Sequence, residues 1–375
     1  MISRCRRILL LVILAGTQPA NASVPAELVI PIREVRAVER EGQGNAGATA
    51  AWKIIAAAEG KAIPAILEAM DGANDYALNW FRSAVEVIAQ RETTAGHHLP
   101  ATELETFLRD THHHPRARRM AYELMVQIKP ELARTLLSGF VNDPSNELRR
   151  DAVQQLVNAA EVTTAKDKPA GIASYRRALG FARESDQIDA VAKKLGELGD
   201  PVDLRSVFGW VTRWKLIGPF DNTGGAGFEQ AFAPEKQVDL AAEQDGKSTK
   251  VHWVDFETKS DYGVVDFNKP FSSLKEVTGY AYAEFWSETA RTVQLRLGCK
   301  NGWKIWANGQ FLFGRDEYHR AAEIDQYRLP LTLKPGRNLL LVKCCQNEQT
   351  EDWTKEWEFQ LRITDEQGTP IVSSK

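Results

Sequence analysis

Aromatic residues are distributed very unevenly along this chain of 375 residues. Of 33 Trp, Phe and Tyr residues, 24 follow residue 205, among them eight of the ten Trp. The first part is rich in Ala, Leu, Glu and Arg, which favour helix. The second part alternates Val and aromatic residues with frequent turn residues, which favours β-strands. The sequence therefore predicts a multidomain α+β protein, with helices in residues 23–205, a β domain in residues 206–375, and the boundary after Gly196–Pro201.

Overall composition excludes several classes of protein. Apolar residues make up 43% and charged residues 26% of the chain, as in folded globular proteins rather than disordered chains. The formal charge of the chain is −3. It becomes about −6 without the three arginines of the first 22 residues, which have the pattern of a cleaved leader. A net acidic chain without a basic run is a poor binder of nucleic acid. We therefore expect no nucleic-acid partner.

The first 22 residues have the pattern of a secretory signal peptide. Arg4, Arg6 and Arg7 precede the apolar run of residues 8–15, and Ala20-Asn21-Ala22 places small residues where the leader peptidase cuts. Cleavage near Ala22 predicts an extracytoplasmic protein, periplasmic or secreted. No later run reaches about 18 apolar residues, so we expect no membrane span.

The helical part contains a repeated unit. Each unit consists of an apolar helix ending in Asp, a short turn, and a helix that carries Arg-x-Ala, with the Ala at positions 84, 121 and 152. Ala fits where two helices cross closely, and the Arg can pair with an Asp of a neighbouring unit. The units pair the following segments: 66–71 with 81–88, 105–110 with 118–125, and 138–143 with 149–156.

These units resemble the HEAT-repeat family, most closely in the run Asp143-Pro144-Ser145-Asn146-Glu147-Leu148-Arg149-Arg150-Asp151-Ala152. The resemblance covers roughly residues 47–160, and residues 170–199 continue as helices without the signature. It implies a short α-solenoid, whose curved surface would bind an unknown protein partner. A rigid spacer without a partner remains the alternative.

The second part predicts an antiparallel jelly-roll β-sandwich. No helix-length periodic run separates its strands, and Asn308-Gly309 is a strong signal for a type I′ hairpin. The expected strands cover residues 213–220, 250–257, 280–286, 292–299, 303–307, 310–313, 327–333, 338–345 and 357–364.

The order of two motifs in this part is similar to that of galactose-binding-like jelly rolls. Trp306-Ala307-Asn308-Gly309 is followed by Leu333-Lys334-Pro335-Gly336-Arg337-Asn338, and the match covers about residues 278–365. Together with the leader and the helical units, the whole chain resembles a group of exported bacterial HEAT-repeat proteins to which no activity is assigned. The resemblance implies a fold, whereas function depends on the site.

The most polar stretch of the β part is the candidate ligand site. Asp316, Glu317, Tyr318 and Arg320 follow the hairpin, and Gln346 leaves a later strand, so all should gather at one end of the sandwich. Carboxylates accept from sugar hydroxyls, Arg donates to them, and Tyr stacks on a sugar ring. The stretch therefore predicts a glycan site. A hydrogen-bonded structural loop remains open, and Asp316 with Glu317 leaves paired-carboxylate hydrolysis open.

Two further features concern metal and sulfur. Asp221 and Asn222 begin a glycine-rich segment that could hold a structural Ca²⁺ ion or serve as a flexible connector; no other cofactor is expected. Cys299 and Cys344 both fall on the buried side of predicted strands. They either pair or remain buried thiols.

The sequence as a whole predicts an exported binding or scaffold protein without enzymatic activity, with a solenoid for protein interaction and a sandwich for glycan binding. An accessory carbohydrate-processing factor or weak glycoside hydrolase is one alternative. A purely structural envelope protein is the other.

Overall fold

The computed structural model describes residues 24–375, so the predicted leader lies outside the described part of the chain. The chain divides into two compact units, one ending at Arg149 and the other spanning Arg150–Lys375. Helices come first and antiparallel strands follow, which confirms the expected α+β class. Within residues 24–375, no helix is long and apolar enough to cross a membrane.

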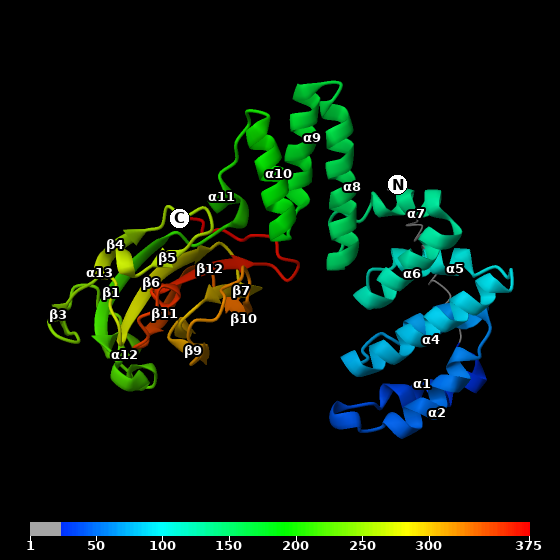
Figure 1. The fold of residues 1–375 in the computed structure, drawn as a ribbon, viewed down its shortest axis with the longest axis horizontal. Coiled ribbons are helices and arrows are strands. Elements are labelled where there is room, and N and C mark those ends of the chain that lie inside the picture. The colour runs from blue at the N-terminus through cyan, green and yellow to red at the C-terminus, as the bar shows by residue number, and fades with distance from the viewer. Residues whose placement is uncertain (1–23) are drawn as a thin grey trace, which may run out of the picture. The chain divides into compact units, whose positions relative to one another are not determined.

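The first unit is entirely helical, and its helices succeed one another in chain order in Figure 1. Most neighbouring helices pack as pairs, such as α1 with α2 and α5 with α6. The helices of this unit are α1 (Ala26–Arg36), α2 (Asn45–Ala56), α3 (Ile63–Glu68), α4 (Asp75–Thr94), α5 (Ala101–Arg109), α6 (Pro115–Ile128) and α7 (Pro130–Leu137), followed by the start of α8 (Asn146–Thr164).

The repeated Ala positions are buried as expected, whereas Arg82 and Arg119 of the repeat pair with Glu86 and Glu123 of their own helices. Ala84 and Ala121 are fully buried in their helices. The buried Arg118 guanidinium pairs with both Asp143 carboxylate oxygens, at 2.6 and 2.7 Å, and so joins the second unit of the repeat to the third. The expected helix over 138–143 is wrong, because α7 ends at Leu137 and turns follow. The HEAT character of the array stays a prediction.

The second unit opens with helices that have a hydrophobic cluster of their own next to the strands. α9 (Lys168–Phe181), α10 (Ser185–Glu197) and α11 (Leu204–Phe208) pack with the end of α8 over a cluster that includes Trp210. Arg362 on strand β12 donates to the Phe208 carbonyl at 3.1 Å. The division between compact units therefore falls within α8, whereas residue 205 marks the change from helices to strands. Independent folding on either side of residue 205 stays a prediction.

The strands of the second unit form two main antiparallel sheets. The first has six strands in the order β4-β1-β6-β11-β8-β9, and the second has four in the order β10-β7-β12-β5. The strands are β1 (Arg213–Asp221), β2 (Gln244–Asp245), β3 (Lys250–Val251), β4 (Val254–Glu257), β5 (Val265–Asp266), β6 (Val277–Ser287), β7 (Arg291–Cys299), β8 (Gly302–Ala307), β9 (Gln310–Arg315), β10 (Tyr327–Leu333), β11 (Gly336–Gln346) and β12 (Glu358–Thr364).

One hydrophobic core lies between the two sheets. Residues from both contribute alternate side chains to it, for example Leu216 of β1 and Leu361 of β12, which are fully buried. Asn308 and Gly309 both have positive φ, 51° and 80°, and join β8 to β9, which confirms the predicted hairpin. The jelly-roll connectivity remains a prediction.

The outer face of the six-stranded sheet has a second apolar layer. Residues 222–253, which we call the cover segment, contain the short helix α12 (Ala233–Lys236) and the pair β2–β3. The cover packs Val251 and Trp253 against outward-facing residues such as Tyr280 and Leu341. The ammonium group of Lys343, fully buried, donates to the Phe228 and Gln230 carbonyls and pairs with Glu235 at 2.8 Å. This contact fixes the cover to the sheet.

Candidate functional site

A pocket opens where β1 and β6 stop pairing. Their ladder reaches Lys215 opposite Tyr282, and beyond that pair the two strands separate. Arg213 and Trp214 continue to pair with β4 on the other side, opposite Glu257 and Phe256. The hollow between the separated strands has a volume of about 450 Å³, and we call it the fork pocket. Its position follows from the end of the strand pairing.

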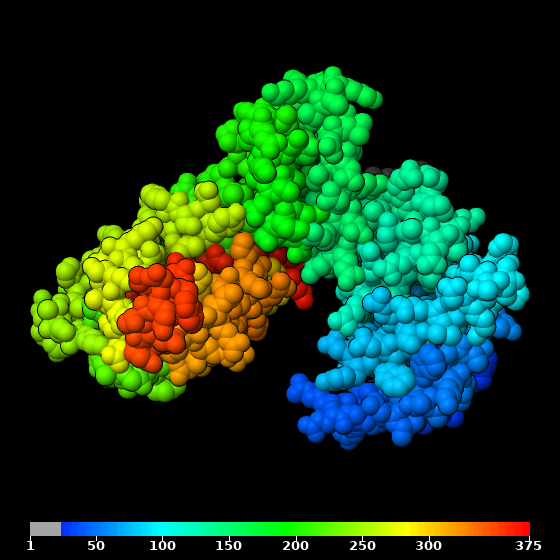
Figure 2. All heavy atoms as spheres, in the orientation of Figure 1, coloured from blue at the N-terminus to red at the C-terminus, as the bar shows by residue number. Residues whose placement is uncertain are grey.

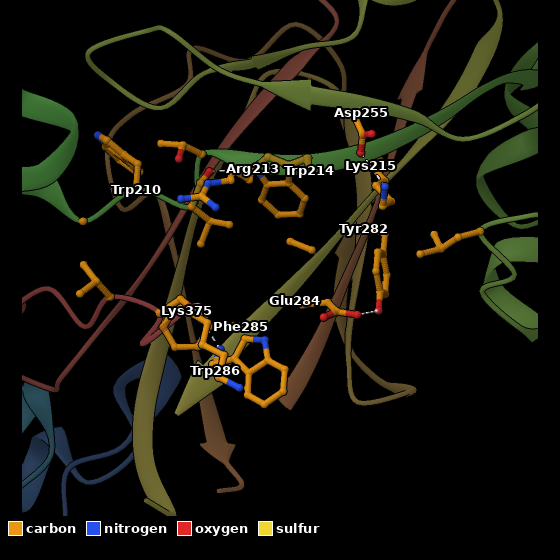
Figure 3. A pocket seen from close by; sticks show the side chains of 17 residues that line it. Trp210, Arg213, Trp214, Lys215, Asp255, Tyr282, Glu284, Phe285, Trp286 and Lys375 are labelled. Atoms are coloured by element: carbon orange, nitrogen blue, oxygen red, sulfur yellow. Dashed lines mark hydrogen bonds and ion pairs between the residues drawn. The ribbon is translucent and has the colours of Figure 1, made fainter. Parts of the chain in front are cut away.

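Two sets of side chains face each other across the fork pocket (Figure 3). The first set comes from β1, β4 and the segment before β1. The second comes from β6 and from residues 372–375, which lie beside its end. The labelled residues of the first set are Trp210, Arg213, Trp214, Lys215 and Asp255, and those of the second are Tyr282, Glu284, Phe285, Trp286 and Lys375.

Both carboxylates of the pocket have partners. Lys215 pairs with Asp255 at 2.5 Å. The Tyr282 hydroxyl donates to Glu284 at 3.0 Å, and Arg337 lies 3.1 Å from the same carboxylate oxygen. Burial, with the Glu284 carboxylate beside it, raises the pKa of Tyr282 to about 12. This hydroxyl is therefore a donor throughout the physiological range.

The Trp286 ring lines one side of the fork pocket. Its side chain is partly exposed, and the Lys375 ammonium lies 3.8 Å from its ring centroid. Its backbone is bonded to the segment beside it, because Trp286 N donates to Ser373 Oγ at 2.9 Å and Ser374 N donates to its carbonyl at 3.1 Å. The ring is thus held in place at the edge of the pocket.

The sequence pattern carried a usable signal for this pocket. Tyr282, Glu284 and Trp286 alternate along β6 and therefore share its outer face, whereas Ala283 and Phe285 face the core. This alternation places an aromatic ring, a carboxylate and a phenol on one face of the strand, where a ligand could reach them. The pattern predicted a strand over residues 280–286 but no site on it.

The predicted ligand residues lie at the opposite end of the strands. Gln346 is fully buried, and its amide nitrogen donates to the carbonyls of Thr354 and Glu356 at 2.9 and 3.1 Å. Its amide oxygen accepts from Asn301 and from the backbone of Asn347. All of its polar atoms are used within the protein, so its side chain does not face solvent.

The other predicted residues are only partly brought together. Tyr318 is partly buried, and its hydroxyl accepts from Asn222 at 3.2 Å, while the Asn222 amide also donates to the Gln346 carbonyl. Glu317 lies 3.3 Å from Arg320, which is exposed, as is Asp316. The loop end therefore holds an internal hydrogen-bonded cluster and, at the surface, Glu317 between Arg315 and Arg320.

An exposed tryptophan stands beside this cluster. Trp353 is 61% exposed, and its ring meets the edge of His319 at a centroid distance of 5.5 Å. His319 in turn contacts Asn347 at 2.7 Å. In Figure 2 the orange and orange-red atoms of these loops lie at the surface of the second unit. The Trp353 ring is the feature of this end most suited to stacking on a ligand.

The two residues proposed for Ca²⁺ point in different directions. The Asp221 carboxylate accepts from Thr223 and faces the Lys247 ammonium at 3.1 Å, and this contact lowers its pKa together with the Thr223 hydrogen bond. Asn222 is buried, and its amide oxygen has no hydrogen-bond partner. Across residues 24–375, no group of three or more His, Cys, Asp or Glu side chains could hold a metal ion. The Ca²⁺ site stays a prediction.

The two cysteines in question meet across the core. Cys299 on β7 and Cys344 on β11 belong to different sheets, and their sulfur atoms lie 3.8 Å apart as buried thiols. Burial raises the pKa of Cys344 well above its usual value. In this structure the pair is unbridged.

No family model matches the chain, and no curated protein matches it. Solved structures do show likenesses, and the three described here each cover about two fifths of the chain. One is a PA14 sugar-binding domain from an RTX adhesin, with 17% identity, a TM-score of 0.24, and coverage of 40% of this chain and 87% of that one.

Two glycosidases also appear among these likenesses. A GH31 α-xylosidase from Xanthomonas citri has 11% identity and a TM-score of 0.21, and a β-glucuronidase from Ruminococcus gnavus has 14% and 0.24. They match 42% and 41% of this chain but only 16% and 28% of their own lengths. Such low TM-scores cannot carry the function of any of the three proteins to this chain.

Proposed function

We propose that the second unit is a carbohydrate-binding module and that the fork pocket is its sugar site. The observation that carries this proposal is the combination around one hollow of an aromatic ring, a phenol and two carboxylates: Trp286, Tyr282, Glu284 and Asp255. Sugar sites combine apolar ring faces with a few fixed polar groups, and ligand pockets generally have this composition.

Each group has a role in this proposal. The Trp286 face packs against the apolar side of a sugar ring after the Lys375 ammonium moves aside. Glu284 and Asp255 accept from sugar hydroxyls, and Lys215 donates to them. Because Tyr282 and Arg337 hold Glu284, and Lys215 holds Asp255, the acceptors are oriented before the ligand arrives.

A glycan array with the whole protein tests the proposal. Trp286→Ala and Glu284→Gln should each weaken binding to any array hit by at least about tenfold, as loss of a stacking face or a charged acceptor predicts. Trp353→Ala is the matched control, because it removes an exposed tryptophan from the opposite end. If Trp353→Ala abolishes binding and the two pocket variants keep it, the sugar site lies at the loop end, with Asp316, Tyr318 and Arg320.

The rest of the expected function belongs to the same proposal. The two sheets would be a jelly roll of the galactose-binding-like kind, and the helices a HEAT-like solenoid that binds a partner protein outside the cytoplasm. Buried Ala84 and Ala121 and the Arg118–Asp143 pair support the repeat. N-terminal sequencing of the protein recovered from an expressing bacterium tests export, since a mature start at Ser23 is expected.

Hydrolysis is a second candidate activity, favoured by one observation. Asp255 and Glu284 line the same pocket, as a two-carboxylate mechanism requires. Release of reducing sugar from an array hit would support it, provided that Glu284→Gln abolishes the release. Binding without any release leaves the module as a binding domain.

A further inference from the structure

The charges around the fork pocket are not balanced equally. Three lining side chains are cations and two are carboxylates: Arg213, Lys215 and Lys375 face Asp255 and Glu284. Each carboxylate already lies beside a cation, Asp255 beside Lys215 and Glu284 beside Arg337. Among the lining side chains, two cations, Arg213 and Lys375, are therefore left without a carboxylate side chain beside them.

Arg213 is one of these two cations. It is the first residue of β1 and exposed, and in the part of the chain that the structure describes no carboxylate lies within ion-pair distance of it. Glu257, its cross-strand neighbour, instead pairs with Lys259 at 2.6 Å. Because β1 and β6 have separated here, the Arg213 side chain borders the hollow.

Lys375 adds a second cation on the other side of the pocket. Its ammonium lies over the Trp286 ring, and among residues 24–375 it has no ion pair with a carboxylate. A ligand that packs on Trp286 therefore comes close to Lys375, and its edge toward β1 meets Arg213.

We propose that the fork pocket selects acidic sugars, namely uronic acids, whose ring carboxylate binds Arg213. This inference rests on the proposed function of the same pocket. The guanidinium group presents parallel N–H donors that match a planar carboxylate, and such charge-assisted pairs are stronger than neutral hydrogen bonds. A neutral sugar would leave the Arg213 charge without a partner.

The test compares two probes that differ at one group of each ring, a charged carboxylate or its neutral methyl ester. Oligogalacturonate carries a carboxylate on each ring, and its fully methyl-esterified form has the same rings without the charge. Calorimetry with the whole protein should show that the acid binds at least about tenfold more tightly than the ester at low salt. Raising the salt concentration should reduce this difference, because the pocket is open to solvent.

Arg213→Gln should remove the preference for the acid, so that the affinities for acid and ester become equal. Arg328→Gln is the matched control, since Arg328 is another exposed arginine on a strand, in the other sheet. It should leave the preference for the acid intact. A preference that survives Arg213→Gln would overturn the role of Arg213.

The outcomes also separate this inference from the function on which it rests. Equal binding of acid and ester, weakened in both by Trp286→Ala, would overturn the acid selectivity and leave sugar binding in place. An empty glycan array, together with no binding of either probe, would overturn both. Stronger binding of the ester than of the acid would also overturn the acid selectivity, because it would show that Asp255 and Glu284 make the electrostatic potential of the pocket negative.

Discussion

The strand pair β1–β6 ends in two very different ways. At the end near residues 221 and 277, polar side chains are numerous and mostly bonded to one another: Gln346 uses all its polar atoms, and Asn222 donates twice. At the end near residues 213 and 286, polar side chains are fewer, but the strands have separated and a hollow remains. Polar density by itself does not indicate a binding site. A binding site is indicated by open space beside polar groups whose orientation is fixed.

The largest effect is expected from the cover segment, which lies between these two ends. Lys343→Met should lower the free energy of unfolding by about 3–5 kcal/mol, because it leaves the nearly buried Glu235 carboxylate without its cation. Urea unfolding measures the loss. The double variant Lys343→Met with Glu235→Leu should recover most of it. If the single variant is as stable as the wild type, the cover does not depend on this pair.

The second effect is expected at the loop end. Gln346→Met keeps the side-chain volume but removes the acceptor of the Asn347 N–H and one of the two donors to each of the Thr354 and Glu356 carbonyls, at roughly 1–3 kcal/mol for a buried group left unpaired. The melting temperature should therefore fall clearly. Affinity for an array hit should stay unchanged in the folded variant. A weakened affinity at an unchanged melting temperature would instead place Gln346 in a ligand site.

These two ends also show how far the sequence can predict this molecule. Alternation and turn residues placed most strands correctly to within a few residues, and Asn308-Gly309 predicted its hairpin. The two-residue strands β2 and β5 were missed because they are too short to show alternation. The helix expected over 138–143 failed because the local apolar residues pack as a turn.

The site could be predicted less well, for a physical reason. A sequence shows which residues are polar, so the run Asp316–Arg320 was prominent. A sequence does not show where the hydrogen bonding between two strands ends. The fork pocket exists because β1 and β6 separate beyond Lys215 and Tyr282. A sequence also does not show that Gln346 finds four partners within the protein.

The third effect concerns Tyr282 at the fork. Tyr282→Phe removes the hydroxyl that orients Glu284, so binding to an array hit should weaken several-fold with little change in melting temperature. The wild type should also show one more phenol ionising near pH 12, seen as the difference in ultraviolet absorbance between the two proteins. An unchanged affinity would mean that Glu284 does not need this donor.

The same phenol affects stability in alkaline solution. Its pKa in the folded protein, about 12, lies above the ordinary value of 10, so the unfolded chain releases its proton first as the pH rises. The contribution of Tyr282 to stability is therefore complete below pH 10 and is lost between about pH 10 and 12. Tyr282→Phe should lose stability less steeply than the wild type over this interval, as urea unfolding at several pH values would show.

The smallest effect is expected from Asp316, and it discriminates most sharply between the two ends. Asp316 is exposed, so Asp316→Ala should change the free energy of unfolding by no more than about 0.5 kcal/mol. If the fork pocket is the sugar site, affinity for an array hit should not change either, because the residue lies at the opposite end of the strands. If the loop end binds the sugar, the variant loses an acceptor and affinity falls while the melting temperature stays. A lowered melting temperature with unchanged affinity would instead assign Asp316 to the hydrogen-bonded loop. Parallel titrations and melts of the wild type, Asp316→Ala and Glu284→Gln therefore place the site at one end or the other, because only one of the two variants can lose affinity if there is a single sugar site.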